Sequence, residues 1–72
     1  MTLVEGSLET EYIIESIDID DDEVKSFLFT LGCYEGEPIT IVGQRRNNLT
    51  VAVKDARYSI DVLLASAITV KE

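Results

Sequence analysis

The sequence predicts a mainly β fold, a small and strongly bent barrel of about five short strands with one inserted α-helix at residues 21–31. Several short segments rich in β-branched residues alternate between apolar and polar positions and are separated by turn residues. Only one segment carries apolar residues at helical spacing. The chain has 72 residues, too few for two domains, so we expect a single domain over residues 1–72. Closing the sheet into a barrel would remove its open edges.

The first strand and the helix come early in the chain. A strand is expected over residues 11–19, where β-branched residues alternate with polar ones. The helix should follow, because apolar residues recur at i, i+3, i+4 and i+7, namely Val24, Phe27, Leu28 and Leu31. We expect Asp20 to cap its first turn in a capping box with Glu23. Gly32 stands where a left-handed residue would close the helix.

The second half of the chain reads as β structure. A strand is expected over residues 38–44, followed by a tight turn at Asn47-Asn48, whose residues tolerate positive φ. Alternating residues 49–54 form the next strand, and a turn near Asp55-Ala56 leads to a short strand with Tyr58 and Ile60. Residues 61–66 suit a short helical turn, and residues 67–71 a closing strand.

Charge and composition exclude several classes of function. Fourteen acidic and six basic residues give a net charge of −8, which opposes nucleic acid or anionic lipid as the main partner. With one cysteine and no histidine, the chain can build neither a disulfide nor a soft-metal site by itself, which indicates a reducing compartment. No signal peptide and no apolar run of about 20 residues is visible, so we expect a cytoplasmic protein without membrane insertion.

Three groups of residues suggest a site, and each also has a plainer interpretation. Asp18, Asp20 and Asp22 match the first positions of a calcium loop, but the required glycine and final glutamate are replaced, so we favour helix capping and leave weak divalent contact open. Cys33 could be a ligand or a redox thiol, and we favour packing in the core. No nucleophile–base pair or phosphate loop is present, and we expect no enzyme and no cofactor.

Two further features concern surfaces. Arg45 and Arg46, with Lys54 and Arg57 nearby in sequence, could form a small basic patch, but a solubilising hairpin tip is the stronger interpretation. Phe29 lies on the helix away from the apolar stripe, so it either packs under a loop or is presented to a partner.

One stretch resembles a known family. Residues 31–41, Leu-Gly-Cys-Tyr-Glu-Gly-Glu-Pro-Ile-Thr-Ile, resemble the Leu-Gly-x-x-x-Gly-x-x-hydrophobic-x-hydrophobic signature of the FeoA family, small cytoplasmic proteins of bacterial ferrous iron transport. Residues 65–70 resemble the closing Ala-x-x-Ile-x-Val, and the resemblance covers about residues 8–72. The chain departs from the family pattern at three places. It has Glu35-Gly36 where the family commonly has Pro-Gly before the second strand, and its loop between the middle strands is shorter. It also has Asp61-Val62-Leu63-Leu64 where the family usually has a basic stretch after the fourth strand.

The resemblance implies an SH3-like barrel with an inserted helix, in which Leu31, Gly32 and Gly36 are structural. It also implies an accessory protein that binds the cytoplasmic region of the transporter FeoB and modulates iron uptake or GTPase activity. Such a protein would be a monomer or weak homo-oligomer, held at the inner face of the membrane only through its partner. The alternative is a stand-alone regulatory domain acting with an iron-dependent transcriptional repressor, whose C-terminal domain shares this barrel. A peptide-binding barrel is disfavoured, because no cluster of aromatic residues for proline recognition is visible.

The expected partner-binding residues lie in two places. Phe29 and Tyr34, with Cys33 beside them, would form an aromatic patch at the end of the helix with an acidic border. Arg45 and Arg46 at the hairpin would contribute orientation.

Overall fold

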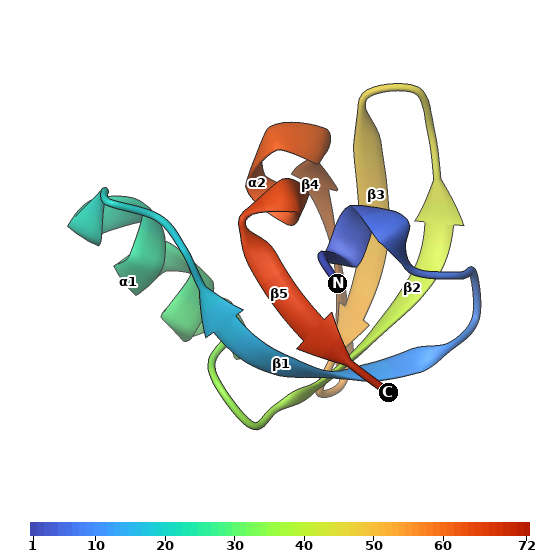
Figure 1. The fold of residues 1–72 in the computed structure, drawn as a ribbon, viewed down its shortest axis with the longest axis horizontal. Coiled ribbons are helices and arrows are strands. Elements are labelled where there is room, and N and C mark those ends of the chain that lie inside the picture. The colour runs from blue at the N-terminus through green and yellow to red at the C-terminus, as the bar shows by residue number, and fades with distance from the viewer.

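Five antiparallel strands form one sheet in the order β4-β3-β2-β1-β5 in the computed structural model, which describes residues 1–72 (Figure 1). The strands are β1 (Glu11–Ile17), β2 (Pro38–Gln44), β3 (Asn48–Val53), β4 (Ala56–Asp61) and β5 (Ile68–Lys71). The helices are the 3₁₀-helix η1 (Leu3–Glu5), α1 (Asp22–Leu31) and α2 (Val62–Ser66). The predicted mainly β fold with one inserted helix is confirmed, and η1 is an element that the sequence pattern did not reveal.

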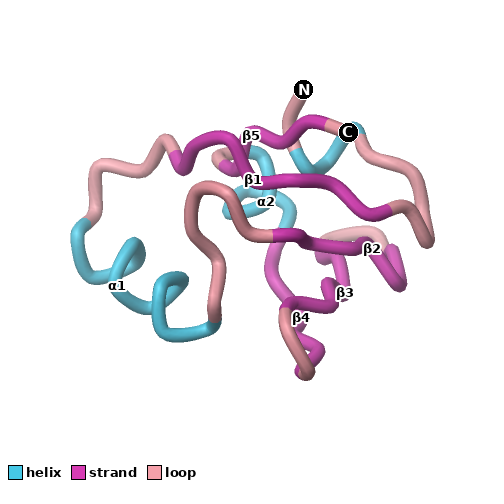
Figure 2. The backbone as a smooth tube through the Cα atoms, turned by 90° about the horizontal axis from the view of Figure 1, so that it is seen from below, coloured by secondary structure: helices cyan, strands magenta, loops and turns pink.

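The sheet curls around the core without closing into a barrel (Figures 1 and 2). Its end strands β4 and β5 do not pair with each other, so the expected removal of both edges is wrong. Register shifts between Ile14 and Ser16 in β1 and between Ile41 and Gly43 in β2 interrupt the ladders, and such bulges bend a sheet. The outer edge of β5 is covered by the N-terminal residues instead of by β4, because the Val70 N–H donates to the Met1 carbonyl at 2.8 Å.

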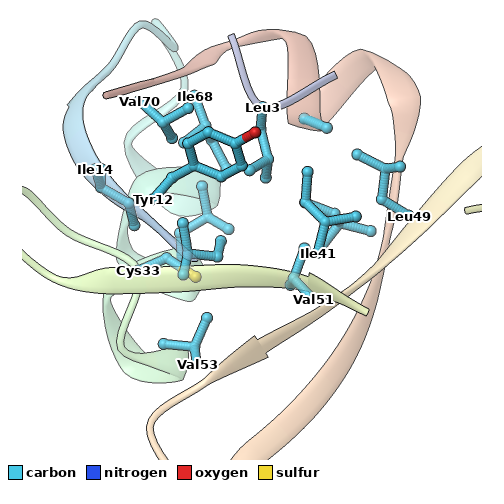
Figure 3. Close-up of a cluster of buried hydrophobic side chains, with 14 residues drawn as sticks. Leu3, Tyr12, Ile14, Cys33, Ile41, Leu49, Val51, Val53, Ile68 and Val70 are labelled. Atoms are coloured by element: carbon cyan, nitrogen blue, oxygen red, sulfur yellow. The ribbon is translucent and has the colours of Figure 1, made fainter. Parts of the chain in front are cut away.

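The core lies on the concave face of the sheet (Figure 3). Alternate residues of β2 and β3 point into it, as the period-two pattern predicts. The helix η1 adds Leu3, which is fully buried, and α2 adds Ala65. Tyr12 is the core's one residue with a hydroxyl, and that hydroxyl accepts a hydrogen bond from the Ser7 N–H at 2.8 Å. No charged side chain is buried.

Helix α1 stands at the side of the sheet, and Leu28 is its one fully buried residue, with Val24 and Leu31 packed against the core beside it (Figure 1). Val24 and Leu31 are only half-buried, and Phe27 is 55% exposed. The expectation that Phe27 faces the core is therefore wrong, because the short sheet covers only the centre of the apolar stripe. None of the helices is long and apolar enough to cross a membrane.

The residue predicted to cap the start of α1 is wrong, whereas the residue predicted to close its end is confirmed. The cap is Asp21 rather than Asp20, because the Asp21 carboxylate accepts the N–H of Glu23 at 2.9 Å and of Val24 at 3.3 Å. Gly32 closes the helix in the left-handed conformation with φ 96°, as predicted.

The two hairpin turns differ from expectation in where the backbone is left-handed. The β2–β3 connection reverses through Arg45, Arg46 and Asn47 with no positive φ, and the Arg45 N–H donates to the Asn48 carbonyl at 2.8 Å. A connection longer than two residues spreads the reversal, so it needs no left-handed asparagine. The tighter β3–β4 turn does need one such residue, and there Lys54 adopts φ 55°.

Candidate partner-binding surface

Phe29 and Tyr34 form an aromatic pair at the surface. Their ring centroids lie 4.9 Å apart with the planes inclined at 34°. Phe29 is 63% exposed, the greatest exposure of any aromatic side chain here, and Tyr34 is half-buried. Contacts of this length between tilted rings are favourable beyond their buried area, so the pair holds its own shape.

The end of α1 builds this pair. Leu28 anchors the last turn in the core, and the left-handed Gly32 reverses the chain directly after it. The Cys33 N–H then donates to the Leu28 carbonyl at 2.9 Å. This closure turns Tyr34 back alongside Phe29, so the two aromatic residues predicted to lie together do so.

An open groove of about 640 Å³ lies beside the pair. Its first wall is the end of α1, with Phe29, Leu31 and Tyr34. Its second wall comes from the β3–β4 hairpin and includes Val53 and Tyr58. On the other side of the pair is a smaller hollow of about 200 Å³, which includes Ile17, Lys25 and Glu35 in its lining. The aromatic pair is thus a ridge between two depressions.

Lys54 makes two electrostatic contacts beside the aromatic pair. Its ammonium group forms an ion pair with Glu37 and lies 5.5 Å from the centroid of the Tyr34 ring. The hydrogen bond from Lys54 lowers the pKa of Glu37 below its ordinary value, and the same bond raises the pKa of Lys54. A cation over the face of a tyrosine is attracted by the ring, so Lys54 and Phe29 both hold Tyr34 in place.

Cys33 lies beneath the ridge rather than on it. Its side chain is 1% exposed, and burial raises the pKa of the thiol above its ordinary value. A buried, protonated thiol is a weak nucleophile and a weak metal ligand. This position favours the packing interpretation of Cys33, which reaches the surface only as part of the lining of the smaller hollow.

The arginines lie elsewhere. Arg45 and Arg46 precede β3 and Lys54 follows it, so the strand separates them by roughly 20 Å at about 3.3 Å per residue. The single basic patch considered from the sequence is therefore not formed. The groove residues contributed by the β3–β4 hairpin, among them Lys54 and Tyr58, were not among the predicted site residues. The alternation of β4 could have indicated Tyr58, because it shares a face with the buried Ile60.

The acidic run near α1 does not gather into a metal site. Asp18 accepts a hydrogen bond from the Thr69 hydroxyl at 3.2 Å, and Asp21 caps the helix. Nowhere in the chain do three or more His, Cys, Asp or Glu side chains converge so as to hold an ion.

Comparison with protein families decides the affiliation of this fold. The profile described as the FeoA domain matches residues 1–72. The chain belongs to the FeoA family. FeoA proteins are associated with ferrous iron transport, and they are small accessory SH3-like domains rather than a known class of enzyme. A comparison with curated proteins found no match.

Solved FeoA structures share the whole fold. The crystal structure of Stenotrophomonas maltophilia FeoA complexed with zinc, described as a prokaryotic SH3 domain protein, has 28% sequence identity and a TM-score of 0.85 over 99% of this chain and 89% of that one. FeoA from Chlorobium tepidum has 19% identity and a TM-score of 0.90 over 99% of this chain and 69% of that one. A manganese-dependent transcriptional repressor, at 16% identity and TM-score 0.88, matches 99% of this chain with 40% of its own. The SH3-like architecture expected from the sequence is confirmed.

Proposed function

We propose that this protein is a cytoplasmic accessory protein of ferrous iron transport that binds the cytoplasmic part of a FeoB-type transporter and modulates iron uptake or its GTPase activity. Membership of the FeoA family supports the transport context. The observation that carries the binding role is the exposed Phe29–Tyr34 ridge beside an open groove. Association with the transporter would also place the protein at the inner face of the membrane.

The chemistry of the ridge suits a reversible protein contact. Exposed aromatic residues are typical anchors of interfaces, and truncation of such an anchor costs about 2 kcal/mol or more of binding free energy. The linings of the groove and the hollow contain Asp55 and Glu35 beside Lys54 and Lys25, and Lys54 is paired with Glu37. The net charge of −8 on the whole chain therefore favours a basic segment of the transporter, whose association would be faster at low salt.

The hairpin arginines have a secondary part in this proposal. Arg45 and Arg46 are exposed and lie at the far end of β3 from the ridge. A partner segment seated in the groove would reach them only if it extended along the sheet. We therefore assign them orientation of the complex and expect their loss to slow association rather than abolish it.

The test compares the two aromatic residues of the ridge with a third aromatic residue on the same helix. Phe29→Ala and Tyr34→Ala should weaken binding of the purified cytoplasmic region of the transporter at least tenfold, measured by calorimetry. Phe27→Ala is the matched control, because Phe27 lies on the same helix, is 55% exposed and lines neither depression. Normal binding by both ridge variants, or an equal loss in Phe27→Ala, would show that the ridge is not the contact surface.

The repressor alternative is tested by the choice of partner of the wild-type chain. The fold match to the manganese-dependent repressor supports a shared architecture. If the protein acted with an iron-dependent repressor, the wild-type chain would bind that repressor and leave the transporter region unbound. The transporter proposal expects the reverse.

We do not expect this chain to share zinc binding with its Stenotrophomonas relative. The Stenotrophomonas FeoA structure was obtained with zinc, which prefers several thiolate or imidazole ligands. This chain has no histidine, its one thiol is buried, and no cluster of acidic ligands is assembled. The residues present do not fit a tight zinc site.

A further inference from the structure

Strand β4 is an open edge of the sheet, whereas the opposite edge is covered. Thr2 bridges to Thr69, and the Met1 carbonyl accepts from Val70, so the N-terminal residues cover β5. On β4 only β3 occupies the hydrogen-bonding side, and the other element that packs closely against the strand is α2, which directly follows it in the chain. Exposed edges of this kind are templates for another strand.

The register of the β3–β4 hairpin shows which backbone groups are free. Val53 and Ala56 flank a two-residue turn, and a flanking pair of that kind is hydrogen-bonded. Hydrogen-bonded and non-hydrogen-bonded pairs alternate along an antiparallel ladder, so Arg57 and Ser59 direct their N–H and C=O groups away from β3. No hydrogen bond within the chain outside its helices and strands uses these groups.

Most devices that blunt a sheet edge are missing from β4. The strand contains no proline, and its pairing with β3 runs without a register shift, unlike the ladders of β1 and β2. Its inward side chains, Ala56, Tyr58 and Ile60, carry no charge. Only Arg57 and Asp61 place charges along the outer face, and these have opposite signs.

We propose that β4 pairs antiparallel with β4 of a second copy, forming a two-fold symmetric dimer with one continuous sheet. Ser59 would lie opposite Ser59 of the second copy, so that the free groups of the two strands bond to each other. Arg57 then stands opposite Asp61 of the second copy, and the symmetry repeats that pair. On the inner face, Tyr58 lies beside Ile60 of the second copy and extends the apolar wall of the groove.

Charge selects this occupant and this register. The only ion pair within the chain joins Lys54 to Glu37, which leaves Arg57 without an ionic partner. One oxygen of the Asp61 carboxylate caps α2 by accepting the Leu64 N–H at 2.7 Å, and the other remains free. Two neighbouring registers satisfy the same backbone rule. One would set Asp61 opposite Asp55 of the second copy, and like charges directly opposite are destabilising. The other would set Arg57 opposite Leu63, which lies in α2 beyond the end of the strand, and would leave Arg57 without an ionic partner.

The net charge of −8 on each copy opposes the dimer over longer distances. The Debye length falls from about 30 Å at 0.01 M salt to about 8 Å at 0.15 M. Each copy measures 28 × 24 × 23 Å, so physiological salt screens most of the repulsion between copies while the adjacent Arg57–Asp61 pairs are screened less. Self-association should therefore strengthen as salt rises through this range.

The first test measures mass against concentration. Sedimentation velocity of the whole chain between about 10 μM and 1 mM should show a monomer–dimer equilibrium that is tighter at 0.15 M than at 0.01 M salt. Arg57→Glu should weaken it roughly tenfold or more, because two like-charged pairs replace two attractive ones. Lys71→Glu is the matched control, with the same change of charge on the opposite edge strand.

The second test separates the edge from folding. Ser59→Pro removes an N–H that β3 does not use, so the variant should keep its fold, checked by its melting temperature, and lose the dimer. Mild oxidation of Ser59→Cys should give a cross-linked dimer, whereas Thr50→Cys, one strand further from the axis, should not.

A chain that stays monomeric up to 1 mM at both salt concentrations would overturn the proposal. So would a dimer unaffected by Ser59→Pro and Arg57→Glu. An edge that ignores a second copy but accepts an extended segment of another protein would also contradict it. Transporter binding through the ridge would survive each of these results.

Discussion

Gly32 and Gly36 share the left-handed conformation, with φ of 96° and 89°, but their surroundings differ. A Cβ at Gly32 would meet Val53 Cγ1 and Lys54 Cε at 3.1 Å each, whereas a Cβ at Gly36 would meet nothing within 4 Å. Both glycines belong to the motif at residues 31–41 that resembles the FeoA signature. Only at Gly32 would a side chain also collide with the β3–β4 hairpin that forms one wall of the groove.

This difference predicts unequal costs. Gly36→Ala should lower the free energy of unfolding by about 1 kcal/mol through backbone strain alone. Gly32→Ala should cost more, because its methyl group must also displace Val53. Urea denaturation of the two variants measures the difference. Equal losses of unfolding free energy would mean that Val53 and Lys54 move aside from the new methyl group at no cost.

The Glu37–Lys54 ion pair predicts a pH dependence with a definite sign. The pKa of Glu37 is depressed in the folded state, so its contribution is present above the ordinary glutamate pKa of about 4.3 and is lost as pH falls through the lower folded value. The pKa of Lys54 is raised, so its contribution is present below about 10.4 and is lost as pH rises through the higher folded value.

Glu37→Gln tests that dependence without a large change of shape. The melting temperature of the variant should lie slightly below that of the wild type between these limits, since an exposed pair contributes little. The two curves should converge in acid. A difference that grows below the ordinary glutamate pKa would contradict the assignment.

At the scale of single elements, the cap of α1 offers a sharp comparison. Asp21→Ala should destabilise the helix by about 1 kcal/mol, because two backbone N–H groups lose their acceptor. Asp20→Ala removes the same charge one residue earlier and should change stability much less. Since α1 is anchored mainly by Leu28, hydrogen exchange of its amides is the sensitive measurement. Equal exchange rates in the two variants would refute the cap.

How far the sequence predicts each element depends on how local its determinants are. The bounds of β2 were predicted to the residue, because proline, alternation and a following turn all lie within a few positions. The meeting of Phe29 and Tyr34 was also predictable, since Gly32 lies between them. The exposure of Phe27 was not, because it depends on where α1 sits against a distant sheet. The three-residue η1 has no periodicity that could reveal it.

The second wall of the groove shows the same limit. Tyr58 faces the end of α1 only because β4 pairs with β3 and the sheet curls around the core. That arrangement joins residues far apart in the chain. Periodicity assigns Tyr58 to the inner face of its strand, but it cannot place the helix across from it.

For the molecule as a whole, the ligand inventory predicts weak metal binding. Carboxylates spread over an acidic surface attract hard divalent ions without fixing them. Anaerobic calorimetric titration with Fe²⁺ or Zn²⁺ should give no one-to-one isotherm with a micromolar or tighter dissociation constant. Cys33→Ser serves as a control, and it should leave the titration unchanged. A tight isotherm abolished by this substitution would overturn the prediction.

The pairing of β1 with β5 has a consequence for how the protein is made. Ile13 and Ile17 in β1 lie opposite Lys71 and Ile68 in β5. This pairing therefore joins segments that are more than 50 residues apart in the sequence. Contacts between such distant residues form only after a large loss of chain entropy, and small β proteins rich in them fold in milliseconds to seconds rather than microseconds. During synthesis β1 can pair with β2, but its other edge stays open until residues 68–71 have left the ribosome.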